Sequence, residues 1–189
     1  MKTRLQLFEL NDVPKGLDYK EIKKILREIK DEQGPVQVNG NDLFFKKGEA
    51  WSHNSKEELL YQYRWLKKSR RIDGISVPKP FVFFKIGDIG GYIMEKINGK
   101  TLEELINVNK THIIKNLSDI FKQIKTGIHI LHKNGIPHGD IDPKNILLDN
   151  KGKVFLIDPY KHENTIIGKL DDRKKLIEME KFFASIKDK

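Results

Sequence analysis

Three polar side chains in the last third of the chain have types and spacing suited to a chemical reaction. Asp140 ends the segment H-G-D, Asn145 follows five residues later, and Asp158 follows an apolar run. A carboxylate can accept a hydrogen bond from a hydroxyl group and orient that group. Carboxylate and amide oxygens are also ligands that magnesium prefers, and magnesium usually takes few of them from the protein. The pattern indicates a site that aims a hydroxyl group beside a magnesium ion.

The residues around this site predict a β-hairpin. The apolar runs 146–148 and 154–157 flank the turn residues D-N-K-G at 149–152. Such a hairpin would carry Asn145 and Asp158 to the same end of a sheet. An ordinary surface hairpin with scattered acids is the alternative interpretation, because Asp and Asn are common in turns.

The order and spacing of these residues resemble the catalytic loop and metal-binding strand of protein-kinase-like phosphotransferases. In that family an H-R-D aspartate is followed five residues later by an asparagine, and a later aspartate comes from D-F-G. The resemblance implies transfer of the ATP γ-phosphate to a hydroxyl group, with Asp140 as base and with Asn145 and Asp158 as Mg²⁺ ligands. It also implies that His138 braces the loop. Lys144 would contact the transferred phosphate, and a solvated lysine is the alternative.

The segment departs from the common kinase pattern at two places. Gly139 stands at the H-R-D arginine, and Pro159-Tyr160 stands at the phenylalanine and glycine of D-F-G. His-Gly-Asp is more typical of atypical members, which include RIO kinases, the small kinase of the KEOPS tRNA-modification complex, lipopolysaccharide core heptose kinases and aminoglycoside phosphotransferases. Since proline fixes its own backbone and lacks an N–H donor, the usual in/out flip of this segment is not expected.

A second segment resembles the hinge of small kinases. It reads I-M-E-K-I-N-G at 93–99. The resemblance implies that backbone groups of Glu95 to Ile97 bind adenine and that Met94 gates the pocket behind it. A buried strand followed by a turn is the alternative interpretation.

The family's phosphate-binding lysine is expected in a predicted hairpin at 36–47, which turns at Asn39-Gly40. Lys46 is the preferred residue because it follows three apolar residues, as in V-A-I-K. Lys47 is the alternative, and on a strand the two side chains would point to opposite faces. No G-x-G-x-x-G segment precedes them, so the glycine loop that covers the phosphates in the family is not expected.

A predicted helix at 55–71 should supply the partner of that lysine. Glu58 is the first choice, although Ser55 and Glu58 also form an S-x-x-E capping box. Gln62, one turn further on, is the alternative, and it could hydrogen-bond a lysine without neutralising its charge.

Two acids near the end of the chain have two interpretations. Asp171-Asp172 resembles the acid that anchors the catalytic loop in RIO-like and lipopolysaccharide kinases. Alternatively, acids that open the last helix would complement its dipole.

The patterns together predict an α+β fold with the minimal two-lobed plan of the protein-kinase-like family. A lobe at 1–93 would contain a small antiparallel sheet and an extra helix at 18–33, which Gly34-Pro35 would end. A hinge at 94–99 would lead to a shortened helical lobe at 100–189, because 31 residues follow Asp158.

Composition limits the classes of partner and location. The chain has 189 residues, a net charge of +9 and no cysteine. The charge favours an anionic partner such as a nucleotide, nucleic acid, phosphorylated sugar or membrane surface, and a solvated lysine-rich surface is the alternative. No convincing set of aromatic residues interleaved with basic ones supports nucleic-acid binding. With no membrane-spanning run and no export signal, we expect a cytoplasmic setting.

These patterns lead to two alternative hypotheses for the function. The first is an ATP- and Mg²⁺-dependent phosphotransferase whose acceptor is a protein serine or threonine, or a sugar such as a lipopolysaccharide core. The second is a pseudokinase or nucleotide-binding scaffold without turnover, which the absent glycine loop and Pro159 favour. The sequence does not choose the acceptor.

Overall fold

The chain divides into two compact units, which are described separately. The computed structural model describes residues 5–8, 13–28, 33–48, 55–108 and 110–187. The first unit combines two stretches of the chain, Met1–Lys67 and Pro78–Lys96. The second combines Lys68–Val77 and Ile97–Lys189.

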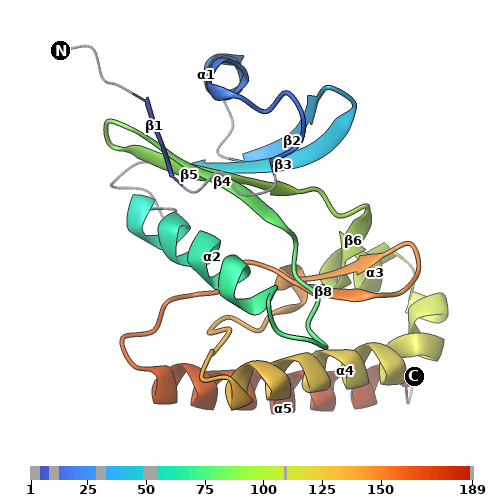
Figure 1. Ribbon diagram of the computed structural model, residues 1–189. Coiled ribbons are helices and arrows are strands. Elements are labelled where there is room, and N and C mark those ends of the chain that lie inside the picture. The colour runs from blue at the N-terminus through green and yellow to red at the C-terminus, as the bar shows by residue number, and fades with distance from the viewer. Residues whose placement is uncertain (1–4, 9–12, 29–32, 49–54, 109, 188–189) are drawn as a thin grey trace. The chain divides into compact units, whose positions relative to one another are not determined.

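A five-stranded antiparallel sheet forms the first unit, in the order β1-β4-β5-β3-β2 (Figure 1). Its strands are β1 (Leu5–Phe8), β2 (Gln33–Val38), β3 (Asn41–Gly48), β4 (Pro80–Ile86) and β5 (Ile89–Glu95). Two helices accompany it, α1 (Tyr19–Glu28) and α2 (Lys56–Ser69). The helices lie on opposite faces of the sheet (Figure 1).

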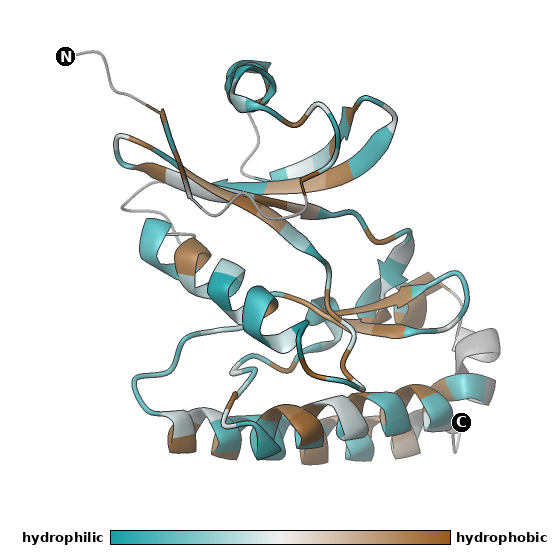
Figure 2. Ribbon diagram, in the orientation of Figure 1, coloured by the Kyte–Doolittle hydropathy of each residue, from teal (hydrophilic) through white to brown (hydrophobic). Residues whose placement is uncertain are grey.

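Each face of this sheet buries its own set of apolar side chains. On the α1 side, Ile22 belongs to a buried cluster that includes Phe45. On the α2 side, the ring of Tyr63 lies 5.8 Å from that of Phe83 and 6.2 Å from that of Tyr92. Because neighbouring residues of a strand point to opposite faces, burial on both sides explains the apolar strands in Figure 2.

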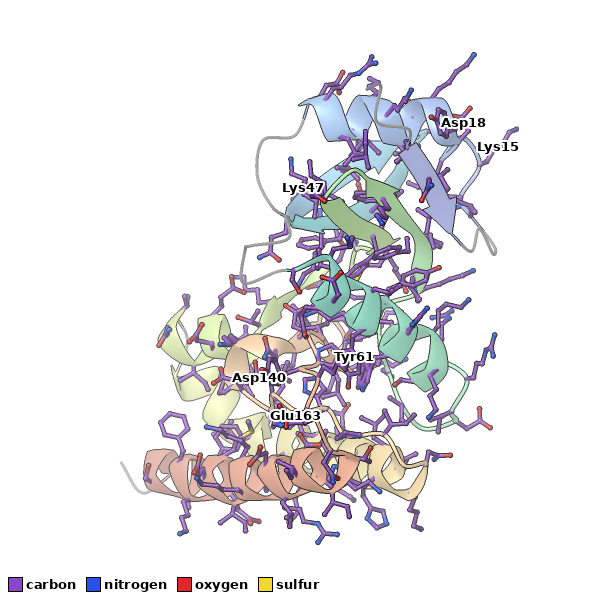
Figure 3. The ribbon with its side chains drawn as sticks, turned by 90° about the vertical axis from the view of Figure 1, so that its left-hand side faces the viewer. Lys15, Asp18, Lys47, Tyr61, Asp140 and Glu163 are labelled. Carbon is purple, nitrogen blue, oxygen red and sulfur yellow. The ribbon has the colours of Figure 1, made fainter. Side chains whose placement is uncertain are left out.

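The first helix ends earlier than the sequence predicts. Asp18 caps its start, where Oδ1 accepts hydrogen bonds from two backbone N–H groups of the first turn, each at 2.9 Å (Figure 3). The helix spans Tyr19–Glu28, whereas the predicted helix 18–33 continued to Gln33. Gln33 is instead the first residue of β2, so the predicted C-terminal end is wrong.

Gly34 and Pro35, read as a helix stop, belong to β2. This strand pairs with β3 throughout Gln33–Val38 and lies at the edge of the sheet. An edge strand tolerates proline because one of its sides has no partner strand that requires a donor. Glycine and proline end helices and also occur in edge strands, so the Gly34-Pro35 pattern alone does not distinguish the two structures.

The predicted turns and helix caps of this unit are confirmed. Asn39 and Gly40 have φ angles of 48° and 79°, which suit a type I′ turn between β2 and β3. The N–H of Glu58 donates to Ser55 Oγ at 3.2 Å at the start of α2. β4 and β5 pair in an antiparallel direction.

The second unit contains a three-stranded antiparallel sheet and three α-helices among its described residues. The strands, in spatial order, are β6 (Gly99–Thr101), β7 (Ile146–Asp149) and β8 (Val154–Leu156). The helices are α3 (Leu102–Val108), α4 (Lys110–Lys133) and α5 (Thr165–Lys187), with a short 3₁₀ helix, η1 (Pro143–Asn145). The described buried face of α4 follows the helical repeat and consists of Leu117, Ile120, Ile124, Ile128 and Leu131. α4 packs beside α5, where the rings of Phe121 and Phe183 meet edge to face at 5.7 Å.

The α+β class is confirmed, since both units combine antiparallel strands with helices. The chain passes from the first unit to the second between Lys96 and Ile97, inside the predicted hinge at 94–99. The role of that segment as a hinge, and the lobes at 1–93 and 100–189, stay predictions. Among the helices of the described residues, none combines the length and apolar character that a membrane span requires.

Candidate functional site

The loop between α4 and η1 carries the first candidate residue, Asp140 (Figure 3). The loop is fixed at its end by η1. Asp142 caps this short helix, because its Oδ1 accepts a hydrogen bond from Lys144 N–H at 3.1 Å. Pro143 occupies the first position of η1, where a missing N–H costs nothing. These local interactions turn the chain sharply from Asp140 into β7.

Asn145 holds Asp140 through the side-chain amide. Its Nδ2 donates to the Asp140 backbone oxygen at 3.0 Å and to Asp140 Oδ2 at 2.7 Å. Asn145 is 4% exposed, so water competes little for these bonds. Since the two N–H groups of the amide are used in this way, its remaining polar atom, Oδ1, is an acceptor of the kind that a magnesium ligand requires.

The β7–β8 hairpin brings Asp158 to the end of the sheet at which Asn145 lies, as the sequence predicts. Ile146 pairs with Leu156, and one residue further out Ile157 N–H donates to Asn145 O at 3.0 Å. Asp158 follows at once with a φ of 54°. This left-handed conformation is uncommon outside glycine, and such positions concentrate at functional sites.

His138 is completely buried under the loop. Its Nδ1 accepts a hydrogen bond from Asp140 N–H at 3.4 Å. Burial lowers the pKa of the His138 imidazole, and the negative charges of Asp172, Asp140 and Asp158 oppose that effect only in part. The ring is therefore neutral at neutral pH. Its geometry suits the predicted bracing role, which stays a prediction.

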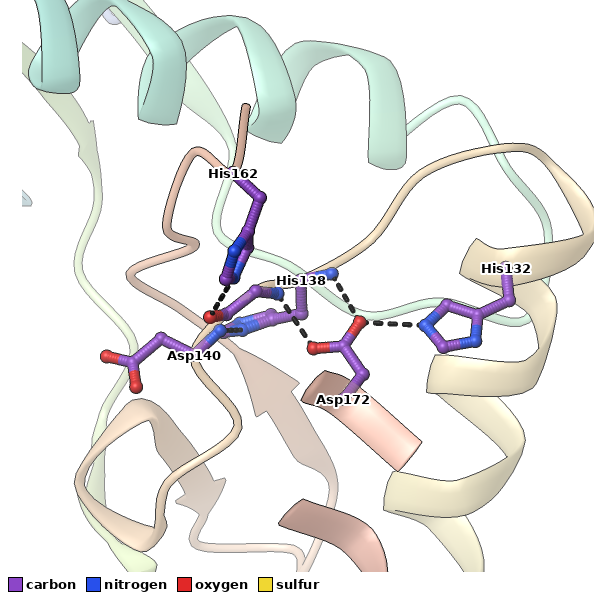
Figure 4. A network of polar contacts seen from close by, with 6 residues as sticks. His132, His138, Asp140, His162 and Asp172 are labelled. Atoms are coloured by element: carbon purple, nitrogen blue, oxygen red, sulfur yellow. Dashed lines mark hydrogen bonds and ion pairs between the residues drawn. The ribbon is translucent and has the colours of Figure 1, made fainter. Parts of the chain in front are cut away.

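Asp172 of α5 anchors the same loop (Figure 4). Its fully buried carboxylate accepts hydrogen bonds from the N–H groups of His138 at 2.8 Å and Gly139 at 2.7 Å. Because α5 begins at Thr165, Asp172 lies about two turns from the N-terminus, where the helix dipole has little effect. Of the two interpretations of Asp171-Asp172, the anchor is the one that the structure supports.

Two histidines were not assigned to the site from the sequence. His132, at the end of α4, has Nε2 2.7 Å from Asp172 Oδ2. His162 has Nε2 2.9 Å from Gly139 O (Figure 4). Its Nδ1 lies 3.5 Å from Asp171 Oδ2. The partners are separated by 40 residues in the first case and 23 in the second, so no local spacing could have revealed them.

The segment after Asp158 packs directly on Gly139. Tyr160 N–H donates to His138 O at 2.9 Å. Gly139 has a φ of 85°, and a Cβ atom added there would lie 2.3 Å from Tyr160 O. The position therefore accommodates glycine and excludes the arginine that the H-R-D pattern has there.

Lys46 and Lys47 lie on opposite faces of β3, as the alternation along a strand predicts. Lys46 is 5% exposed and stands opposite Tyr92, whose hydroxyl donates to Gln62 Oε1 of α2 at 3.0 Å. Residues directly opposite on paired strands share a face, so Lys46 lies on the α2 side of the sheet. Lys47 lies on the other side, at the position marked in Figure 3.

The partner of the lysine stays a prediction. Glu58 lies in the first turn of α2, partly buried, and its backbone N–H takes part in the helix cap. The side-chain oxygen of Gln62 already accepts the hydroxyl of Tyr92. Choosing Glu58 over Gln62 therefore rests on charge: only the glutamate could neutralise a lysine.

The proposed adenine-binding segment begins at the end of β5. Met94 is 6% exposed and pairs with Phe44 of β3. Glu95 and Lys79 hold each other through two hydrogen bonds, Glu95 N–H to Lys79 O at 2.8 Å and Lys79 N–H to Glu95 Oε2 at 3.0 Å. Ile97 is partly buried at the start of the second unit. Adenine binding by these residues stays a prediction.

The oxygen donors of Asn145 and Asp158 fit a magnesium ion whose remaining ligands come from other molecules. Within the part of the chain that the structure describes, no group of three or more His, Cys, Asp or Glu side chains could hold a metal ion. An ion held by Asn145 and Asp158 would complete its shell with water and phosphate oxygens, which is the usual habit of magnesium. Lys144 of η1 is exposed, and its contact with a phosphate also stays a prediction.

The chain is similar in sequence to known protein kinases. The protein kinase domain matches residues 85–159, which include Asp140, Asn145 and Asp158. Calcium-dependent protein kinase 4 of Plasmodium falciparum is 34% identical over 54% of the chain, and serine/threonine-protein kinase PrkC of Bacillus subtilis is 28% identical over 62%. The EKC/KEOPS complex subunit BUD32 of Gibberella zeae is 30% identical over 57% of the chain.

These relatives are longer proteins. The matches span 19% of the Plasmodium kinase, 20% of PrkC and 44% of the BUD32 subunit. The domain match and the names of the relatives support the expectation of a kinase. Together with the antiparallel sheet, the loop that carries Asp140 and the hairpin that follows it, they support a small protein-kinase-like protein.

Proposed function

We propose that the chain transfers the γ-phosphate of ATP to a hydroxyl acceptor, with Mg²⁺. The observation that carries this proposal is the pair Asp140 and Asn145, joined at 2.7 Å on an anchored loop. A carboxylate that is fixed in direction, next to an amide oxygen and a second carboxylate at Asp158, is what phosphoryl transfer requires of a protein.

Asp140 acts as the base that aims the acceptor. The hydroxyl oxygen attacks the γ-phosphorus, the bond from that phosphorus to the β,γ-bridging oxygen breaks, and ADP leaves. The hydroxyl proton passes to the Asp140 carboxylate. Because Asp140 Oδ2 accepts the Asn145 amide, Oδ1 is the oxygen that faces the acceptor.

Asn145 and Asp158 would hold the metal ion. Magnesium, when bound, neutralises charge on the phosphate oxygens during transfer. Asn145 supplies Oδ1 and Asp158 supplies its carboxylate. The left-handed backbone of Asp158 sets the direction of that carboxylate at the end of β8.

Further residues outside the loop bind the nucleotide. Lys46 binds the phosphates with Glu58 as its counter-charge, and backbone groups of Glu95 to Ile97 bind adenine beside Met94. The buried position of Lys46 opposite Tyr92 supports this choice over Lys47. Lys144 contacts the phosphate in transit.

The acceptor belongs to one of two classes, a serine or threonine of a protein, or a sugar hydroxyl such as that of a lipopolysaccharide core. The names of the relatives favour the first class, because two of them are protein kinases. The exposed cationic residue beside the loop, Lys144, suits a phosphorylated or otherwise anionic acceptor of either class.

Radioactive ATP turnover with Mg²⁺ tests the proposal. Wild type is compared with Asp140→Asn and Asp158→Asn, and with Asp119→Asn, an exposed carboxylate of α4, as the matched control. Transfer to water, to the chain itself or to an added acceptor should fall by about 10²–10⁴ in the first variant. It should also be lost in the second, and the control should equal wild type.

Two other outcomes are informative. Mg²⁺-dependent nucleotide binding that is lost with Asp158→Asn, without turnover in any acceptor screen, would replace the enzyme with a nucleotide-binding scaffold. Turnover that persists in Asp140→Asn would show that the activity belongs elsewhere.

A further inference from the structure

We propose that His162 is a positioning residue that fixes the peptide group between Gly139 and Asp140, and through it the direction of the Asp140 carboxylate. The expected effect of His162 on the reaction rate rests on the proposed phosphotransfer, whereas its expected effect on the order of the loop does not. His162 lies in the segment that joins β8 to α5, four residues after Asp158.

Gly139 is a position of high backbone freedom directly before Asp140. Glycine has the greatest backbone freedom of any residue, and Gly139 uses that freedom to adopt a φ of 85°. A side chain could stiffen this position, but a Cβ atom would lie 2.3 Å from Tyr160 O. The order of the loop must therefore come from hydrogen bonds to its peptide groups.

Four hydrogen bonds supply that order, one to each polar group of the two peptides that flank Gly139. In the first peptide, His138 O accepts from Tyr160 N–H at 2.9 Å and Gly139 N–H donates to Asp172 at 2.7 Å. In the second, Gly139 O lies 2.9 Å from His162 Nε2, and Asp140 N–H donates to His138 Nδ1 at 3.4 Å. The contact to His162 is the shorter of the two that hold the second peptide.

The second peptide is the one that turns Asp140. Its rotation changes ψ of Gly139 and φ of Asp140, which moves the Asp140 side chain relative to Asn145. The hydrogen bond from Asp140 N–H to His138 Nδ1 is long and therefore weak. His162 thus supplies most of the restraint on the plane of the second peptide.

The environment of His162 fixes the ring for this task. Because Gly139 O is an acceptor, Nε2 must carry a hydrogen. The other ring nitrogen lies 3.5 Å from Asp171 Oδ2 of α5, and the edge of the ring contacts Tyr160 at a centroid distance of 5.2 Å. The side chain is 16% exposed, so the contacts are largely shielded. Asp171 and Tyr160 are the titratable groups that the described contacts place against it.

Two variants separate the donor from the shape of the ring. His162→Gln keeps an N–H donor at the position of Nε2, whereas His162→Phe keeps a ring and removes the donor. His129→Phe, on the exposed face of α4, controls for the chemical change itself. Hydrogen exchange of the amides of residues 138–142 and steady-state phosphotransfer are measured in all of them, with nucleotide affinity alongside.

In His162→Phe we expect faster exchange of the Asp140 amide, by about tenfold, and a fall in kcat of about tenfold or more with nucleotide affinity unchanged. His162→Gln should restore both to within about threefold of wild type, and His129→Phe should match wild type. A residue that only stabilises the fold would instead lower the melting temperature and leave kcat unchanged.

The result can also go against the proposal. Exchange and kcat in His162→Phe equal to those of wild type would overturn it, as would equal losses in the Phe and Gln variants. If wild type transfers no phosphate to any acceptor, the proposed function fails. The exchange data then still decide whether His162 fixes the loop.

Discussion

The side-chain amide of Asn145 donates a 2.7 Å hydrogen bond to Oδ2 of Asp140. The proposed base and the proposed metal ligand are thus joined directly to each other. In the proposed reaction, Asn145 would both aim the base and offer an oxygen to the metal ion.

Replacing Asn145 separates these two roles. Asn145→Asp keeps an oxygen ligand but places a carboxylate against that of Asp140, so the pair repels or shares a proton. We expect turnover to fall by about 10² or more with the Mg²⁺ requirement little changed. Asn145→Ala should in addition raise the Mg²⁺ concentration at half-maximal activity. A titration of kcat against Mg²⁺ measures both effects, and wild-type turnover in Asn145→Asp would remove the hydrogen bond from the mechanism.

The two lysines of β3 form a matched pair. Lys46→Met should weaken nucleotide binding by about tenfold or more, because the buried cation that we propose as the phosphate contact is lost. Lys47→Met, on the other face of the strand, should change it by less than about twofold. Calorimetric titration with an ATP analogue measures both, with circular dichroism as the folding control. The reverse order would assign the phosphate contact to Lys47.

Asp172 is expected to stabilise the protein as well as the loop. Asp172→Ala would leave the buried N–H groups of His138 and Gly139 without their acceptor, which should lower the free energy of unfolding by about 2–5 kcal/mol. Glu178→Ala on the same helix removes a half-exposed acid that pairs with Lys175, and it should cost less than about 1 kcal/mol. Urea unfolding of the two variants tests this difference. Equal costs would mean that the anchor contributes nothing beyond an ordinary surface acid.

Gly139→Ala and Gly135→Ala separate backbone strain from steric overlap. Both glycines have positive φ, 85° and 73°, so alanine costs about 1–2 kcal/mol at each. Only at Gly139 would the new Cβ also meet Tyr160 O, because nothing lies within 4 Å at Gly135. Thermal unfolding should show a clearly larger loss for Gly139→Ala, together with reduced turnover. Indistinguishable variants would contradict the packing of Tyr160 on the loop.

His138 should make stability depend on pH in a defined direction. Its pKa is lowered from 6.5 in the folded state, so above that pH neither state binds the proton. Below it the unfolded state binds the proton first, and the free energy of unfolding falls by up to about 1.4 kcal/mol per pH unit. Urea unfolding between pH 7 and about pH 5.5, without magnesium, measures the slope. His138→Gln should be less stable at neutral pH and should lack this component of the slope.

The parts of the fold that depend on near neighbours could be predicted from the sequence. The Asn39-Gly40 turn, the Ser55–Glu58 cap and the hairpin that carries Asn145 and Asp158 each depend on residues a few positions apart. The alternation of side chains along a strand also predicted that Lys46 and Lys47 point to opposite faces of the sheet.

The supports of the loop could not be predicted in the same way. Asp172 and His162 reach Gly139 only after α4, the hairpin and α5 have packed together, and no period in the sequence encodes that packing. The predicted C-terminal end of the first helix was wrong for a related reason. Whether Gly34-Pro35 stops a helix or joins an edge strand depends on which strands lie beside it.

Pro35 also gives the first unit a protection that has nothing to do with catalysis. β2 is an outermost strand, and outer strands can recruit strands of other molecules and start aggregates. Val38 and Asn41 flank the two-residue turn as a hydrogen-bonded pair, and such pairs alternate along the ladder, so Pro35 falls in a pair without mutual hydrogen bonds. The donor that proline lacks is therefore missing on the solvent side. A strand from a second copy would meet a gap in its hydrogen-bond ladder there, so this edge resists growth into larger β-assemblies.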